Sequence, residues 1–228
     1  MEAIILAGGF GTRLQSVVSD VPKPMASVAG RPFLCYLLDR MAPCYSHIVL
    51  ATGHLHEKVE AFFGHEDRGV SIDYARELSP LGTGGAIVNA LQCCREEAVT
   101  VLNGDTLFDI DHAQLAATAD ENGGRLTLVT RRVDDAGRYG AVEVDSTGRV
   151  TAFREKDPAY GEGLINGGIY RLRRSLLAGR PVGQPFSFEK EVLQAMAEPL
   201  FAYASDAYFI DIGIPEDYRR AQTELPAL

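Results

Sequence analysis

The chain has 228 residues, of which 46% are hydrophobic and 23% are charged, and its formal net charge is −9 with neutral histidines. This globular composition excludes a disordered, collagen-like or coiled-coil chain, and the length suits one domain or a tight pair. No stretch approaches the roughly 20 apolar residues that span a bilayer, and no basic segment precedes the first apolar run. The scattered Lys and Arg argue against a nucleic-acid surface. We therefore expect a cytoplasmic protein whose partners include neither nucleic acid nor membrane.

The cysteines and histidines show no spacing typical of a metal site or a disulfide framework. Neither a C-x-x-C pair nor a disulfide pattern occurs among Cys35, Cys44, Cys93 and Cys94. A chain of this length does not need disulfides, so we expect reduced thiols. His54 and His56 diverge on a helix and predict a helix start on the surface rather than a zinc site.

Short apolar runs alternate with helical patterns along the first half of the chain, which is typical of a parallel α/β sheet. Strands are predicted at 2–7, 46–52, 70–76 and 98–102, and helices at 32–43, 55–63 and 83–94. The first half therefore indicates three or four successive βα units.

The second half contains more strands and hairpins. Strands are predicted at 126–132, 140–145, 149–154, 164–172 and 207–212, and helices at 111–121, 188–196 and 215–223. Pro215 suits the first turn of the last helix. No internal repeat, linker or low-complexity segment interrupts this order. One α/β domain over residues 1–228, with a nucleotide-binding type of first half and a more antiparallel second half, accounts for the pattern.

A glycine-rich segment follows the first predicted strand directly. It reads Leu6-Ala7-Gly8-Gly9-Phe10-Gly11-Thr12-Arg13-Leu14. Three glycines let backbone N–H groups turn toward an anion, so the segment predicts a phosphate cradle. It is neither a P-loop, since no Lys-Ser or Lys-Thr follows, nor the dinucleotide fingerprint, since Leu14 replaces the third glycine. A simple glycine turn at a strand end would explain the glycines but not Arg13.

A second element, Val21-Pro22-Lys23-Pro24-Met25, fixes the backbone around one lysine with two prolines. Taken alone, Pro-Lys-Pro is common in solvent-exposed loops. Beside the glycine-rich segment, Lys23 supplies a cation where a triphosphate needs one.

Together, the two elements resemble the signature of the sugar-phosphate nucleotidyltransferases, L-A-G-G-x-G-T-R-L followed by P-K-P. The resemblance implies a Rossmann-like nucleotidyltransferase domain with a mixed, mostly parallel central sheet flanked by helices. It also implies a nucleoside triphosphate and a sugar 1-phosphate as substrates, Mg²⁺ as cofactor, and a nucleotide-sugar and pyrophosphate as products. Arg13 and Lys23 would be the catalytic cations. The nucleotide-binding residues would be Leu6, Ala7, Gly8, Gly9, Gly11, Thr12, Arg13, Lys23, Glu77, Gly82, Thr83, Gly84 and Asp105.

The segment Glu77-Leu78-Ser79-Pro80-Leu81-Gly82-Thr83-Gly84-Gly85 matches the family's base-holding loop. A carboxylate can accept hydrogen bonds from both guanine N1–H and N2–H₂, whereas uracil and thymine offer one donor there. Glu77 is therefore a candidate for guanine selection. A simpler interpretation of Thr83 is that it caps the following helix.

Two aspartates and a set of polar residues complete the implied site. Asp105 and Asp211 end predicted strands and suit oxygen-rich Mg²⁺ coordination, although a lone strand-end aspartate is more often a turn former. The resemblance assigns sugar phosphate binding to Gly140, Glu155, Lys156, Asn166 and Gly168. Without phosphate chemistry, the Glu155-Lys156 pair would be interpreted as a solvated charge pair.

Within the family, several segments resemble the members that transfer GMP from GTP to D-glycero-α-D-manno-heptose 1-phosphate, giving GDP-heptose. These segments are 15–25, 80–87, 138–143, 164–170 and 209–218. Two alternatives are a uridylyltransferase acting on an N-acetylamino-sugar 1-phosphate and a catalytically silent subunit that binds nucleotide-sugar. The oligomeric state stays open, a homodimer included.

Overall fold

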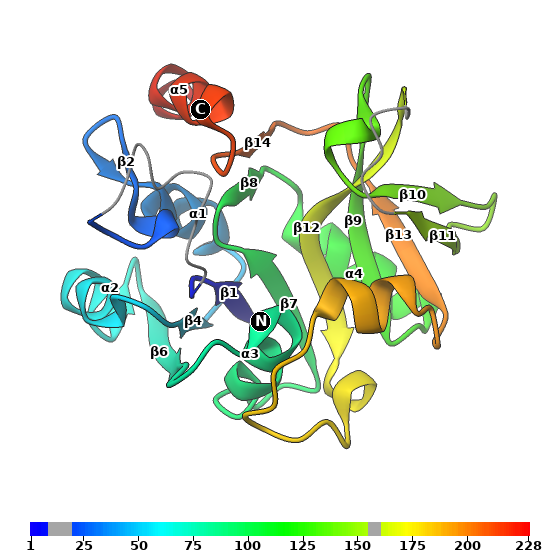
Figure 1. Ribbon diagram of the computed structural model, residues 1–228, viewed down its shortest axis with the longest axis horizontal. Helices are drawn as coiled ribbons and strands as arrows, with labels where there is room; N and C mark the ends of the chain where they lie inside the picture. The colour runs from blue at the N-terminus through cyan, green and yellow to red at the C-terminus, as the bar shows by residue number, and fades with distance from the viewer. Residues whose placement is uncertain (9–19, 155–160) are drawn as a thin grey trace.

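A mixed ten-stranded sheet forms the centre of the computed structural model, which describes residues 1–8, 20–154 and 161–228 (Figure 1). Its strands are β1 (Glu2–Leu6), β4 (His47–Thr52), β5 (Glu66–Asp67), β6 (Val70–Arg76), β7 (Ala98–Asn103), β9 (Leu126–Val133), β10 (Ala141–Val144), β11 (Val150–Arg154), β12 (Gly163–Arg173) and β13 (Leu200–Ala204). The order is β11-β10-β12-β7-β1-β4-β6-β5, with β9 beside β12 and β13 beside β9.

The first half of the chain forms the parallel part of the sheet, as predicted. Strands β7, β1, β4 and β6 are parallel neighbours, and their carboxyl ends therefore meet at one edge. The helices that accompany these strands are α1 (Phe33–Met41), α2 (His56–Phe63) and α3 (Gly82–Ala90). The predicted mixed, mostly parallel sheet with flanking helices is confirmed.

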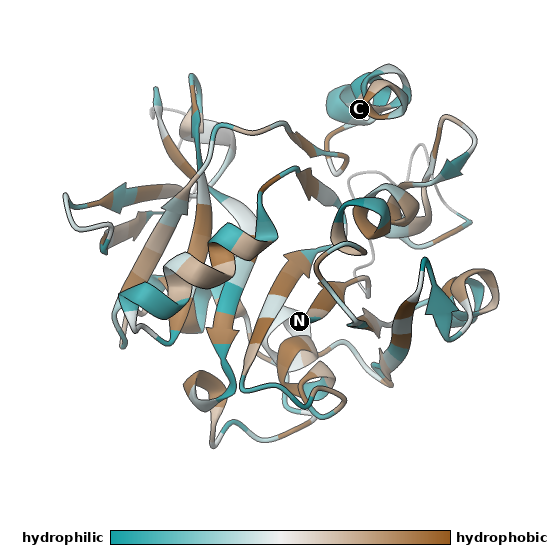
Figure 2. Ribbon diagram, turned by 180° about the vertical axis from the view of Figure 1, so that it is seen from behind, coloured by the Kyte–Doolittle hydropathy of each residue, from teal (hydrophilic) through white to brown (hydrophobic). Residues whose placement is uncertain are grey.

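Apolar side chains on the two faces of the sheet build two separate cores. Ala3 and Ile5 on β1 face the core that includes α1, α2 and α4 (His112–Asn122), whereas Ile4 faces α3 on the other side. This alternation follows from the two-residue period of a strand. Figure 2 shows the resulting concentration of hydrophobic residues along the central strands.

The second half extends the sheet mostly with antiparallel pairs, apart from β13, which runs parallel to β9. β12 pairs antiparallel with β7, β9 and β10, and β10 forms a hairpin with β11. Outside the main sheet, β8 (Thr106–Phe108) pairs with β14 (Phe209–Asp211), and β2 (Ser27–Val28) pairs with β3 (Arg31–Pro32). Helix α5 (Pro215–Glu224) follows β14 and begins at the predicted proline.

Besides the short strands β2, β3, β5 and β8, which were not predicted, three longer elements differ from the sequence prediction. β13 was not predicted, because a short apolar run without alternation does not identify a strand until it pairs, here with β9. The helix predicted over 83–94 is α3, which ends at Ala90. The following turns use shorter-range bonds, such as Cys93 N–H to Ala90 O at 3.0 Å. The helix predicted over 188–196 is a π-helical segment, η4 (Glu189–Gln194).

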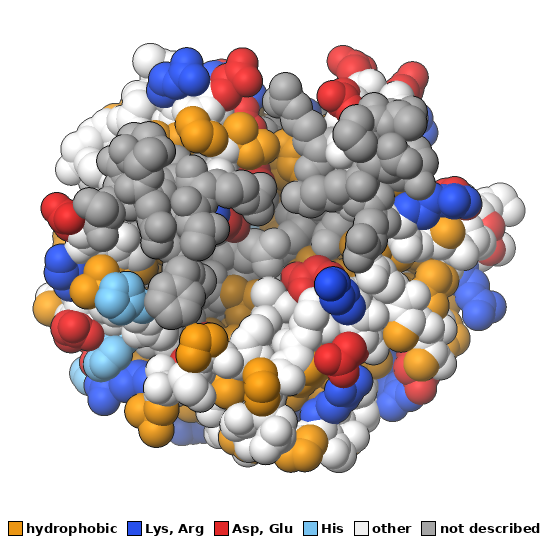
Figure 3. Space-filling view, viewed as in Figure 1, with side chains coloured by type: hydrophobic (Ala, Val, Ile, Leu, Met, Phe, Trp, Pro, Cys, Tyr) orange, Lys and Arg blue, Asp and Glu red, His pale blue; other side chains and the backbone are white. Residues whose placement is uncertain are grey.

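The cysteines and the distribution of surface charges are as the sequence led us to expect. All four cysteines are free, and burial raises the pKa of Cys94 to about 12. Acidic and basic side chains are interspersed on the face shown in Figure 3 rather than gathered by sign. Among the described residues, no helix combines the length and apolar character that a membrane span requires.

A buried histidine ties α4 to the segment before β4. His112 is 4% exposed, and its Nδ1 lies 3.0 Å from the hydroxyl of Tyr45. The two rings also meet edge to face, with centroids 5.3 Å apart. Burial lowers the pKa of His112 to about 4 because the charged imidazolium loses its hydration. The folded protein therefore holds this side chain neutral.

This burial predicts a pH-dependent stability. Unfolded His112 takes up a proton near pH 6.5, whereas the folded side chain does so only near pH 4. The protein therefore has its full free energy of unfolding above pH 6.5. As the pH falls toward 4, the unfolded side chain takes up a proton that the folded one does not, and the free energy of unfolding falls by about 2 kcal/mol between pH 7 and pH 5. In urea unfolding, His112→Gln should flatten this pH dependence. His65→Gln, at an exposed histidine, is the matched control, and equal slopes for wild type and His112→Gln would contradict the prediction.

Candidate active site

Three adjoining cavities lie where the parallel strands end, the usual place for ligands in α/β sheets. The first cavity, of about 430 Å³, lies between the end of β1 and the start of α3. The second, of about 520 Å³, is bordered by β12, β14 and η4. A middle cavity of about 210 Å³ shares Leu6 and Thr83 with the first, and Asp105 and Glu189 with the second. The three form one continuous candidate site.

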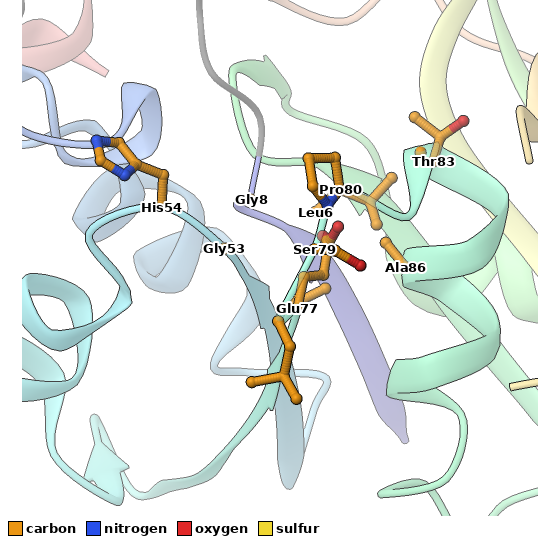
Figure 4. A pocket seen from close by; sticks show the side chains of 12 residues that line it. Leu6, Gly8, Gly53, His54, Glu77, Ser79, Pro80, Thr83 and Ala86 are labelled. Atoms are coloured by element: carbon orange, nitrogen blue, oxygen red, sulfur yellow. The ribbon is translucent and has the colours of Figure 1, made fainter. Parts of the chain in front are cut away.

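The first cavity depends on a close approach between the loops after β1 and β4. A Cβ atom on Gly8 would lie 2.6 Å from Glu77 Oε1 and 3.1 Å from the Gly53 nitrogen. Only glycine therefore allows these backbones to come together. Figure 4 shows His54 on one side of this cavity and Thr83 with Ala86, both from α3, on the other.

Glu77 forms part of the wall of this cavity, and its carboxylate joins the two ends of the loop from Glu77 to Leu81. The Leu81 N–H donates to Glu77 Oε2 at 2.8 Å, and the Glu77 N–H donates to Thr52 O at 2.8 Å. Burial raises the pKa of the Glu77 carboxyl. Each carboxylate oxygen has two lone pairs, so Glu77 retains capacity to accept hydrogen bonds from a ligand.

Thr83 does not cap α3, contrary to the simpler interpretation of the sequence. The helix begins at Gly82, and Leu81 precedes it without a side-chain cap. The Thr83 hydroxyl instead donates to Glu189 Oε2 at 2.6 Å and accepts from the Phe188 N–H at 3.0 Å. Gly84 lies outside the three cavities and packs against Phe186, whose ring a Cβ atom at this position would overlap.

Lys23, Asp105 and Asp211 come together where the middle and second cavities meet. Lys23 Nζ donates to Asp105 Oδ2 at 2.8 Å, and the lysine side chain is only 12% exposed. A Cβ atom on Gly213 would lie 2.7 Å from Asp211 Oδ1, 2.8 Å from Lys23 Nζ and 3.4 Å from Asp105 Oδ2. The three charged groups therefore surround one small space.

Backbone contacts hold this cluster in place. Lys23 opens a 3₁₀ turn (η1, Lys23–Met25), with Pro22 before it and Pro24 within it. The Gly104 N–H donates to Leu6 O at 3.0 Å and sets Asp105 at the end of β1. The Ile212 N–H donates to Asp105 O at 2.9 Å, which ties β14 and its Asp211 to the same place.

The cluster fits Mg²⁺ by its chemistry. In residues 1–8, 20–154 and 161–228, no group of three or more His, Cys, Asp or Glu side chains could hold a metal. Mg²⁺ usually binds through one or two carboxylates, with water and substrate phosphates completing the octahedron. Asp105 and Asp211 are two carboxylates beside one small space, which is the number that such a site requires from the protein.

The second cavity contains three of the residues predicted to bind the sugar phosphate. Gly140, Asn166 and Gly168 line it, together with the aromatic rings of Tyr139 and Phe209. Asn166 donates to the Tyr170 hydroxyl at 2.7 Å and accepts from the Gly168 N–H at 3.0 Å. The β12 register shifts at this point, and a Cβ atom on Gly168 would lie 2.7 Å from Asn103 Nδ2. The asparagine thus holds a bulge that shapes the cavity.

Residues at and around η4 that line the second cavity were missed from the sequence. Glu189 and Lys190 lie at the start of η4 and line this cavity. Charged residues at the start of a predicted helix are typical of a solvated face, so no local signal identified them. The partner of Glu189, Thr83, lies 106 residues away in the sequence.

Six predicted site residues lie outside the described residues. They are Gly9, Gly11, Thr12, Arg13, Glu155 and Lys156. Leu6, Ala7, Gly8, Lys23, Glu77, Gly82, Thr83 and Asp105 are all found at the first or middle cavity.

The sequence and the fold are similar to those of known proteins. A family profile described as nucleotidyl transferase matches residues 2–227. The chain is 44% identical to D-glycero-alpha-D-manno-heptose 1-phosphate guanylyltransferase of Aneurinibacillus thermoaerophilus, over 99% of this chain and 98% of that protein. It is 43% identical to the protein of the same name from Campylobacter jejuni, over 96% and 97%. The crystal structure of HddC from Yersinia pseudotuberculosis complexed with GMP-PN superposes with a TM-score of 0.84 at 35% identity, covering 97% of each chain.

The close approach at Gly104 predicts a sensitive position. A Cβ atom there would lie 2.5 Å from Leu6 O and 3.0 Å from Pro24 Cγ, and backbone cannot easily retreat. Gly104→Ala should lower the free energy of unfolding by about 1–3 kcal/mol, as overpacking does. Gly161→Ala, where a Cβ atom meets no described residue within 4 Å, should change it by less than about 0.5 kcal/mol. Urea unfolding measures both, and equal values for the two variants would contradict the argument.

Proposed function

The chain belongs to the nucleotidyl transferase family, and we propose that it transfers GMP from GTP to D-glycero-α-D-manno-heptose 1-phosphate, releasing pyrophosphate and GDP-heptose. The observation that carries this proposal is the Lys23–Asp105–Asp211 cluster between two cavities. Such a cluster suits the meeting of two phosphorylated substrates. The choice of guanine and manno-heptose rests on the names of the relatives, which cover nearly the whole chain.

The cavities suggest where each substrate binds. The first cavity, with Glu77 and backbone groups of the glycine-containing loops, would hold the base and ribose. The second, with Asn166 and aromatic rings, would hold the acceptor sugar, because a polyol needs hydrogen-bonding groups and an apolar wall. The phosphates would then meet in the middle cavity beside Lys23.

The proposed reaction is an in-line displacement, in which an acceptor phosphate oxygen attacks the α-phosphorus of GTP and pyrophosphate leaves. Positioning and charge neutralisation would dominate, so no general base is required. Lys23 would neutralise phosphate charge. Arg13 and Lys156 would do the same by the family resemblance, and Asp105 and Asp211 would hold Mg²⁺. When bound, Mg²⁺ would offset charge on the phosphates.

We further propose that residues 1–228 act as one domain in the cytoplasm. Both halves of the chain contribute to the same site, since Lys23 and Asp105 come from the first half and Asp211 from the second. GTP and the sugar 1-phosphate would be its small-molecule partners.

A substrate panel tests this function. Pyrophosphate release is measured with Mg²⁺, crossing GTP, UTP, dTTP, ATP and CTP against the 1-phosphates of manno-heptose, mannose, glucose and an N-acetylamino sugar. We expect turnover with GTP and manno-heptose 1-phosphate, and its loss when EDTA removes the metal. Turnover with UTP and the amino sugar would favour the uridylyltransferase instead. No turnover with any pair would favour a silent nucleotide-sugar-binding subunit.

Glu77→Gln tests the guanine contact. The single oxygen of Gln would be needed by the Leu81 N–H, so its NH₂ group would face guanine N1–H, donor against donor. We expect kcat/KM for GTP to fall roughly 10- to 100-fold and kcat/KM for UTP to fall less, because uracil presents one donor to this side chain and guanine presents two.

The matched control for this change is Glu121→Gln, an exposed position on α4 outside the three cavities. It should retain the wild-type ratio of GTP to UTP turnover. An unchanged ratio in Glu77→Gln would remove Glu77 from base selection.

A further inference from the structure

Thr83 and Glu189 form a polar link between the two large cavities. Thr83 lines the first and middle cavities, and Glu189 lines the middle and second. Their hydroxyl and carboxylate meet at 2.6 Å. A residue of the base-holding loop is thus in contact with a residue of the acceptor wall.

The direction of the hydrogen bonds around Glu189 is fixed by the backbone. The Thr83 hydroxyl accepts from the Phe188 N–H, and the Ser187 hydroxyl accepts from the Lys190 N–H at 3.3 Å. Each hydroxyl has one proton, and both protons therefore point to Glu189 Oε2, at 2.6 Å from Thr83 and 3.0 Å from Ser187. Hydrogen bonds to an ionised acceptor are stronger than neutral ones, so this orientation is well held.

The second oxygen of Glu189 is left for a ligand. Within the part of the chain that the structure describes, no protein donor contacts Oε1. Glu189 also lies at the start of the π-helical segment η4, a geometry that often occurs at functional sites. A carboxylate oxygen at the wall of a cavity requires donors, and the hydroxyl groups of a sugar provide them.

We propose that Glu189 binds a hydroxyl group of the acceptor sugar through Oε1 and that Thr83 positions it. The inference rests on the proposed function, because it assigns the second cavity to a sugar 1-phosphate. Its consequence is that a residue on the nucleotide side sets the affinity for the acceptor. Thr83 is then a positioning residue, whereas Glu189 touches the substrate.

Four variants test the link. Glu189→Gln keeps the size of the side chain but has only one oxygen, which the two hydroxyl donors occupy. Thr83→Val removes the hydroxyl, and Thr83→Ser retains it. Glu191→Gln is the matched control, since Glu191 lies two residues along on η4, lines none of the three cavities and pairs with Arg180. Steady-state KM values are measured separately for GTP and for the sugar 1-phosphate that the wild type uses.

We expect Glu189→Gln to raise the acceptor KM roughly 10- to 100-fold and the GTP KM less than about twofold. Thr83→Val should raise the acceptor KM severalfold, Thr83→Ser should restore it, and Glu191→Gln should match the wild type. The double variant Thr83→Val/Glu189→Gln should be no worse than Glu189→Gln, because the two residues act as a unit.

Several outcomes would overturn the inference. They are an unchanged acceptor KM in Glu189→Gln, an effect of Thr83→Val on GTP alone, or additive effects in the double variant. Circular dichroism melting identifies a folding defect, and Glu189→Gln keeps the test valid if Thr83→Val unfolds. Wild-type protein that turns over no substrate pair refutes the proposed function, whereas active wild type with unaffected variants refutes only this link.

Discussion

The ion pair between Lys23 and Asp105 is the contact on which the arrangement of the site depends. Each partner is fixed by its backbone: Lys23 by the turn between two prolines, and Asp105 by the Gly104 N–H bonded to Leu6 O. The pair therefore joins the loop before α1 to the ends of β1 and β7. Because these contacts are present in the fold itself, the two charges already lie together before any substrate binds, which is a condition for effective electrostatic stabilisation.

The same cluster explains why a divalent cation and an anionic substrate would belong together here. Two carboxylates, Asp105 and Asp211, stand against one ammonium group, Lys23, in a small space beside Gly213. Paired carboxylate oxygens favour a divalent cation, which the phosphates of a substrate would then help to coordinate. Substrate phosphate and metal would thus each improve the binding of the other.

The sequence predicted most of the fold, because period and turn signals are local. The βα units up to β7 and the later hairpin were found with boundaries within a few residues, whereas β13 was missed because its pairing with β9 defines it. At the site, Lys23, Asp105 and Asp211 were found through short motifs and their positions at strand ends. Glu189 was not predicted, because its place in the site follows from its contact with Thr83, which lies far away in the chain.

That long-range contact also bears on how one site can handle two substrates. Helix α3 begins at the first cavity and η4 begins at the second, and the Thr83 hydroxyl contacts both Glu189 Oε2 and the Phe188 N–H. The Thr83 side chain therefore connects the starts of α3 and η4, and its hydroxyl proton points to Glu189. If the loop around a bound nucleotide moved, Thr83 would move with it and would shift Glu189 and Phe188 through these two hydrogen bonds. Within the described residues, the Thr83 hydroxyl has no other hydrogen-bond partner that could replace them.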